Sequence, residues 1–135
     1  MLSVRHIRKE YTTRSEPIVV LRDASLEMSA GENLAILGPS GSGKSTLLQI
    51  IGTLDRPTSG TVELEGRTPF SLSEKLLADF RNSSIGFVFQ DHHLLPQLSV
   101  LEHVLVPTIA HGPADKVSIE RAHDMLKRVG LSERL

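Results

Sequence analysis

The sequence predicts an α/β protein in which an antiparallel β layer precedes a parallel core and the start of a helical region. Three observations favour this fold class. Short alternating stretches separated by turn residues fill the first part of the chain, a glycine-rich loop follows an apolar run, and helical spacing dominates the last part. We expect one domain, with the β layer over about 1–32, the core over about 33–90 and the helical part over about 91–135.

The β layer is expected to contain strands joined by polar turns. Residues 2–10 alternate loosely between apolar and polar types, which is typical of a half-exposed strand. The polar stretch 11–17 ends in a proline and indicates a hairpin-like connection. Residues 18–21 and 24–28 predict further strand, and the turn at 29–32 leads into the core.

The loop Gly38–Thr46 fits the pattern G-x-x-x-x-G-K-[ST]. Its glycines allow backbone conformations with positive φ, so that successive N–H groups can form a concave anion site. Lys44 can reach the β- and γ-phosphates of a nucleotide, and the Ser45 hydroxyl can ligate Mg²⁺. The candidate nucleotide-binding residues of this loop are Gly38, Ser40, Gly41, Ser42, Gly43, Lys44, Ser45 and Thr46.

The segments on either side of the loop support this interpretation. Asn33–Leu37 predicts a short buried strand, and Thr46–Ile51 predicts the opening of an apolar helix that ends near Gly52. Strand, glycine-rich loop and helix are the arrangement that the motif requires. The helix would also direct its positive N-terminal end at the phosphates. A purine nucleoside triphosphate is therefore the predicted ligand, in preference to a chance glycine-rich surface loop.

Five further elements are expected after this helix. Residues 61–66 alternate as a strand, and Ser71–Glu74 begins a serine-capped helix with an acidic first turn. The apolar run Ser84–Phe89 predicts a buried parallel strand that brings Gln90 to its carboxyl end, where ligands collect in α/β sheets. The apolar face of the capped helix comprises Leu72, Leu76, Leu77 and Phe80, and helical spacing returns over Val100–Ala110 and Ile119–Val129.

Composition restricts the classes of function. The 135 residues are 39% hydrophobic and 23% charged, which is typical of a globular chain, and the net charge of −1 disfavours a nucleic-acid partner. The absence of cysteine excludes disulfides and thiolate metal sites. The 6 histidines lack the zinc-helix spacing, so metal binding through histidine is disfavoured. No apolar stretch is long enough to span a bilayer, so a membrane connection would require a partner.

Several sequence segments resemble those of the ATP-binding subunit of ABC (ATP-binding cassette) transporters. They occur in the same order and at the same spacing as in that family, over essentially the whole chain. Within that family, the sequence of these segments is most similar to the lipoprotein-releasing (LolD-like) and macrolide-exporter (MacB-like) branch. The segment His92-His93-Leu94-Leu95-Pro96 favours the lipoprotein-releasing side. The segments are Leu21–Met28 with Ala30-Gly31-Glu32, the glycine-rich loop, Leu54–Gly60, Arg81-Asn82, Ile85–Gln90 and Leu94-Leu95-Pro96.

The resemblance implies roles for two residues outside the loop. Tyr11 would stack on adenine, although a tyrosine that fills the seam between strands is the alternative. Gln90 would contact Mg²⁺ or the attacking water and relay the nucleotide state to the membrane subunit. The alternative is that Gln90 is an ordinary polar residue at the end of a strand. Lys44 and Gln90 are thus the candidate catalytic residues, Ser45 and Gln90 the candidate metal ligands, and ATP and Mg²⁺ the implied cofactors.

The resemblance also implies partners and a location. Two ATP-binding subunits would enclose ATP between them, and transmembrane permease subunits would be moved by their closure. Asp91–Leu98 would lie beside the groove for the permease, with Leu94, Leu95 and Leu98 as apolar anchors, although these leucines are also explained by packing within the helical part. The protein would then be cytoplasmic and peripheral on the inner face of the cell membrane. The transported substrate would be chosen by the partner.

The family's signature segment, its Asp-Glu strand and its switch histidine have no counterpart in the 135 residues. We therefore expect the N-terminal portion of a nucleotide-binding domain, an incomplete fold in which the strand beside Asn33–Leu37 is missing and backbone edges are exposed. Two alternatives stay open: an ATP-binding fragment without turnover, and a fragment of a soluble ABC-type ATPase of repair or translation. A P-loop kinase is disfavoured, because Gln90 and the antiparallel layer have no place in it.

Overall fold

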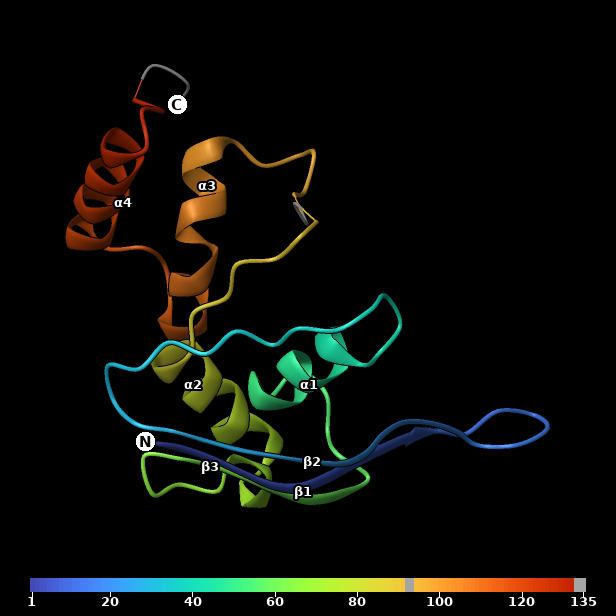
Figure 1. Cartoon of the computed structure of the whole chain (residues 1–135). Helices are drawn as coiled ribbons and strands as arrows, with labels where there is room; N and C mark the ends of the chain where they lie inside the picture. The colour runs from blue at the N-terminus through green and yellow to red at the C-terminus, as the bar shows by residue number, and fades with distance from the viewer. Residues whose placement is uncertain (92–93, 133–135) are drawn as a thin grey trace. The chain divides into compact units, whose positions relative to one another are not determined.

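The computed structural model describes residues 1–91 and 94–132, and the chain divides into two compact units, Met1–Gly86 and Phe87–Leu135. The first unit contains a sheet with two α-helices, and the second contains two α-helices joined by a 3₁₀-helix (Figure 1). Within the described residues, no helix is both long enough and apolar enough to cross a membrane.

The sheet of the first unit is antiparallel, with the order β2-β1-β3. The central strand β1 (Leu2–Tyr11) pairs with β2 (Ile18–Met28) on one side and with β3 (Ser59–Leu64) on the other (Figure 1). The predicted antiparallel layer is thereby confirmed. The two stretches expected at 18–21 and 24–28 form one continuous strand, and the strand expected at 61–66 begins and ends two residues earlier.

Helix α1 (Lys44–Ile51) supplies the second layer over the sheet. The helix begins two residues before the predicted Thr46, and its Leu47 and Ile50 are buried against the sheet. Burial of such side chains stabilises the unit by about 1.5–3 kcal/mol each. The buried core comprises Leu2, Val4, Ile7, Leu21, Leu47, Ile50 and Val62.

The second helix of the first unit, α2 (Glu74–Ser84), follows the short 3₁₀-helix η1 (Pro69–Ser71). The cap is Ser73, whose side-chain oxygen accepts a hydrogen bond from the N–H of Leu76 at 3.5 Å. The predicted apolar face is correct in part. Leu77 and Phe80 are buried, Leu76 is exposed, and Leu72 lies before the helix, because Ser73 is the serine that caps it and the helix begins at Glu74.

The second unit contains α3 (Val100–Leu105), η2 (Val106–His111) and α4 (Lys116–Arg128). The Ser99 side chain and the Glu102 side chain each bond the other's backbone N–H, which forms a complete capping box for α3. The predicted helix over 100–110 is α-helical only as far as Leu105. Pro107 has no N–H with which to continue the α-helical hydrogen-bond ladder, and the chain tightens into the 3₁₀-helix.

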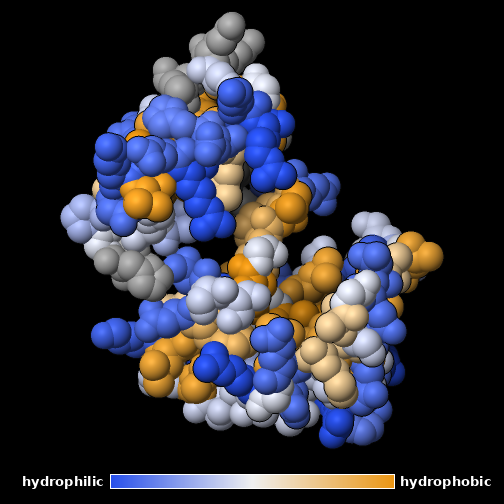
Figure 2. All heavy atoms as spheres, turned by 90° about the vertical axis from the view of Figure 1, so that its left-hand side faces the viewer, coloured by the Kyte–Doolittle hydropathy of each residue, from blue (hydrophilic) through white to orange (hydrophobic). Residues whose placement is uncertain are grey.

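Two predicted strands do not form, and this is the main correction to the expected core. Asn33–Leu37 and Ser84–Phe89 lie outside every strand of the structure, and their side chains are not buried. Leu37 is 89% exposed and Val88 is fully exposed, and apolar patches interrupt the polar surface in Figure 2. A parallel strand is buried only when neighbouring strands and helices cover it, and the described residues supply no such neighbours.

Candidate functional site

The glycine-rich loop is anchored to the sheet at its C-terminal end by Gly43. The φ of Gly43 is +89°, and a Cβ at this position would lie 2.8 Å from Cδ2 of Leu21 and 3.1 Å from the carbonyl oxygen of Val20. Both the conformation and the close approach require glycine. The loop therefore lies against β2 at a fixed point and leads directly into α1, whose N-cap is the same glycine.

The ammonium group of Lys44 turns back into the loop. Its Nζ donates to the carbonyl oxygens of Gly38 at 2.9 Å and Pro39 at 2.6 Å, and the N–H of Ser42 donates to the oxygen of Pro39 at 3.3 Å. These bonds close the loop around a cation. They are made within the loop itself, so they place the positive charge at the start of the helix without using a partner from another element.

The N-terminus of α1 is suited to an anion. Gly43 offers no side chain to cap the first N–H groups, and the first turn carries no acidic residue. Uncapped amides, the helix dipole and the Lys44 charge all favour negative charge at this point. Ser45 is exposed in the first turn, and its hydroxyl is the kind of hard oxygen ligand that Mg²⁺ uses. The residues present therefore fit a nucleotide phosphate with Mg²⁺.

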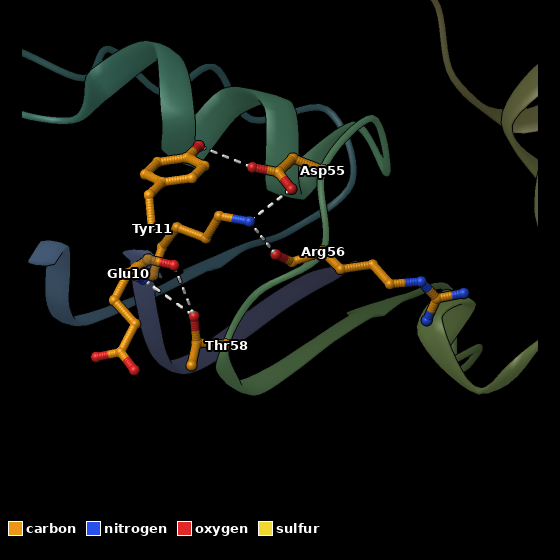
Figure 3. Close-up of polar contacts among 6 residues, drawn as sticks. Glu10, Tyr11, Asp55, Arg56 and Thr58 are labelled. Atoms are coloured by element: carbon orange, nitrogen blue, oxygen red, sulfur yellow. Dashed lines mark hydrogen bonds and ion pairs between the residues drawn. The ribbon is translucent and has the colours of Figure 1, made fainter. Parts of the chain in front are cut away.

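A second polar cluster surrounds Tyr11, at the end of β1 (Figure 3). The phenol of Tyr11 donates to Oδ2 of Asp55 at 2.8 Å, and Nζ of Lys9 donates to Oδ1 of the same carboxylate at 2.6 Å and to the carbonyl oxygen of Arg56 at 2.7 Å. The Lys9 ammonium also lies 4.7 Å from the centre of the Tyr11 ring. The three side chains thus form one connected group.

The electrostatics of this cluster follow from its hydrogen bonds. The Asp55 carboxylate, by accepting the phenolic hydrogen bond, raises the pKa of Tyr11; burial adds to this, and Lys9 and Thr46 act in the opposite direction. Burial alone would raise the pKa of Asp55, but the hydrogen bonds from Lys9 and Tyr11 and the Lys9 charge outweigh it and lower that pKa. The cluster is therefore most stable with Asp55 ionised and Tyr11 neutral.

The second unit contains Gln90 and the described part of the predicted docking segment. Gln90, Leu94 and Leu95 are exposed, whereas His92 and His93 lie outside the described residues. The ring of His103 makes two hydrogen bonds in this segment: Nε2 accepts from the N–H of Leu95 at 2.8 Å, and Nδ1 lies 2.8 Å from the carbonyl oxygen of Ser99. Both bonds together require a neutral ring with the proton on Nδ1. Sequence reasoning did not single out His103.

Comparison with known proteins decides the family. A family model described as ABC transporter matches residues 21–135. The chain belongs to the ABC transporter family. It is 54% identical over 134 residues to the lipoprotein-releasing system ATP-binding protein LolD 1 of Rhodopirellula baltica, covering 99% of this chain and 58% of that protein. It is also 47% identical to the uncharacterized ABC transporter ATP-binding protein YvrO of Bacillus subtilis, covering 59% of its length.

Solved structures of the ABC transporter family agree with the fold. A dimeric ATP-binding cassette, MJ0796, bound to ADP and Pi matches with a TM-score of 0.85 and 38% sequence identity, over 94% of this chain and 56% of that chain. The α/β cassette fold and the resemblance to the lipoprotein-releasing branch, both expected from the sequence, are thereby confirmed. The chain spans somewhat more than half the length of these relatives.

Lys9 and Asp55 are the functional-site residues that sequence reasoning missed. Asp55 lies within the family segment Leu54–Gly60 and Lys9 within the predicted strand 2–10, but the sequence assigns neither of them a role in the site. One signal was available, because Lys9 alternates with the buried Ile7 and with Tyr11 along β1. A lysine on the inward side of a strand requires a partner, and the sequence could not show that Asp55 supplies it.

Proposed function

We propose that this chain is the nucleotide-binding part of the ATP-binding subunit of an ABC transporter of the lipoprotein-releasing type. In the whole protein, ATP binding and hydrolysis would be coupled to lipoprotein release through transmembrane permease subunits, at the inner face of the cell membrane. A second ATP-binding subunit would complete the site that encloses the nucleotide. The relatives named LolD and the dimeric cassette support this assignment.

The observation that carries the proposal is the Gly38–Thr46 loop with its own cation. Lys44 lies among the loop carbonyls at an uncapped helix N-terminus, so positive charge and N–H donors meet at one point. A triphosphate would replace the Gly38 and Pro39 carbonyls as the acceptor of the Lys44 hydrogen bonds. Charge-assisted bonds to phosphate are stronger than the bonds to neutral carbonyls that they replace.

The remaining residues have supporting roles in this proposal. The Ser45 hydroxyl would ligate Mg²⁺, which neutralises phosphate charge, and the exposed ring of Tyr11 would stack on adenine. The backbone N–H groups from Ser40 to Thr46 would donate to the phosphates. Gln90 would contact Mg²⁺ or the attacking water, and Leu94 and Leu95 would meet the permease.

Isothermal titration with MgATP tests the proposal. Replacing Lys44 with alanine removes the loop cation, and we expect the dissociation constant to rise about tenfold or more, as for a lost hydrogen bond to a charged group. Lys75→Ala is the matched control, because Lys75 is an exposed lysine of α2 in the same unit. Equal affinities of the Lys44→Ala variant and the unaltered protein would refute the proposal.

A further inference from the structure

We propose that Lys9 and Asp55 are positioning residues that hold the Tyr11 ring as a preformed stacking surface for the purine base. The inference rests on the proposed function, since it takes the triphosphate to lie in the glycine-rich loop. It goes further by assigning roles to two residues that neither contact the phosphates nor belong to the loop, and by connecting base binding to the turn after α1.

The Asp55 carboxylate connects the Tyr11 ring to the helix that begins at the loop. Its two oxygens are divided between the phenol of Tyr11 and the ammonium of Lys9 (Figure 3). Asp55 itself is tied to α1, because its N–H donates to the carbonyl oxygen of Gln49 at 3.3 Å. The position of the ring is therefore set by the same helix whose other end carries Lys44. The groups that would contact the base and those that would contact the phosphates are thus both positioned by α1.

Lys9 determines which face of the ring is available. Its side chain is only 11% exposed, and its ammonium lies over one face of Tyr11, 4.7 Å from the ring centre. Tyr11 as a whole is 41% exposed. In this proposal the base stacks on the face opposite Lys9, because the ammonium occupies the other one. A cation on one face also draws π-electron density towards itself, which favours stacking of an electron-rich purine on the other face.

The backbone beside the ring is fixed by the same turn. The N–H of Glu10 donates to the hydroxyl of Thr58 at 3.0 Å (Figure 3). The N–H of Thr58 donates to the carbonyl oxygen of Arg8 at 2.8 Å. Both the side chain of Tyr11 and the strand that carries it are therefore bonded to residues 55–58. A surface that is already ordered loses little conformational entropy on binding, which improves affinity for the base.

A purely structural clamp between β1 and the turn would use the same bonds, and it makes a different prediction. A clamp would lower stability when broken, and it would change base and phosphate binding together or not at all. A positioning role changes the contribution of the base alone. The two roles are separated by comparing MgATP with magnesium tripolyphosphate, which has the phosphates of ATP without its base or ribose.

The test measures dissociation constants of the full chain for both ligands by isothermal titration. For Asp55→Asn we expect MgATP to bind about fivefold more weakly, because the ring is less ordered before binding while the loop contacts to the phosphates are kept, with tripolyphosphate affinity unchanged. Lys9→Met should act in the same direction. Glu10→Gln is the matched control, because its carboxylate points away from the cluster and pairs with Arg8, and it should change neither constant (Figure 3).

A double-mutant cycle supplies a second readout. Tyr11→Phe removes only the phenolic hydroxyl, so in that background Asp55→Asn should weaken MgATP binding much less than it does alone. The chain contains one tyrosine and no tryptophan, so its intrinsic fluorescence reports on Tyr11 alone. MgATP should change that emission, tripolyphosphate should not, and Asp55→Asn should reduce the MgATP response.

The outcomes distinguish this inference from the proposed function. Loss of both affinities in Lys44→Ala, combined with a selective loss of MgATP affinity in Asp55→Asn, supports both. Equal weakening of the two ligands in Asp55→Asn, or full additivity with Tyr11→Phe, overturns the positioning role and leaves the loop assignment intact. Unchanged affinities in Lys44→Ala would overturn the proposed function itself.

Discussion

The strands of the antiparallel sheet and the two apolar segments Asn33–Leu37 and Ser84–Phe89 were all predicted to be strands, but they have opposite environments. The central strand β1 has a neighbour on each side and contributes Val4 and Ile7 to a closed core. The two segments are more apolar than β1, yet Leu37 and Val88 face solvent. An apolar run thus favours burial, but the described residues supply no strand or helix that covers these two segments.

The largest expected effect comes from shortening a side chain in the sheet core. Ile7 is fully buried, so Ile7→Ala should lower the free energy of unfolding by about 2–5 kcal/mol through lost burial and a cavity. Val88→Ala, in the exposed segment, should change it by less than about 0.5 kcal/mol. Urea unfolding followed by circular dichroism measures both. A Val88→Ala loss close to that of Ile7→Ala would mean that the segment is covered in solution.

A smaller effect is expected from two glycines, one in each region. Gly60 of β3 has a φ of +96°, and a Cβ there would clash with the carbonyl oxygen of His6, at the irregular part of the β1–β3 pairing. Gly60→Ala should therefore cost about 1–3 kcal/mol of stability through backbone strain. Gly86→Ala meets nothing within 4 Å and should be nearly neutral. Equal unfolding midpoints for the two variants would contradict the close approach at His6.

The same contrast explains how far the sequence could predict the structure. The loop, α1 and β1 were predictable because their signals are local: glycines at fixed spacing, a helical apolar run and alternation. The two missing strands were not, because burial of a parallel strand depends on partners distant in sequence. The bond from Asp55 to Tyr11 spans 44 positions, and no local pattern encodes it. Ser73 was within the predicted capping stretch, and only the structure shows that it caps α2 in place of Ser71.

The smallest expected effect is a pH dependence of the free energy of unfolding, and it arises from Asp55 in the first unit. The pKa of Asp55 is lower in the folded chain than its ordinary value of 3.8, so the unfolded chain binds its proton first on acidification. The stabilisation by Asp55 is therefore complete above pH 3.8 and is lost as the pH falls through the folded pKa.

Asp55→Asn removes this pH dependence of stability, so comparison with the unaltered chain isolates the contribution of Asp55. The difference in unfolding free energy between the unaltered chain and Asp55→Asn should be constant near neutral pH and should shrink on acidification below about pH 4. The change is modest because the Asp55 side chain is 28% exposed and partly screened. Urea unfolding at a series of pH values measures it. A difference that stays constant down to the acid limit would mean that Lys9 and Tyr11 do not stabilise the ionised carboxylate, and that the turn after α1 is held to β1 by packing alone.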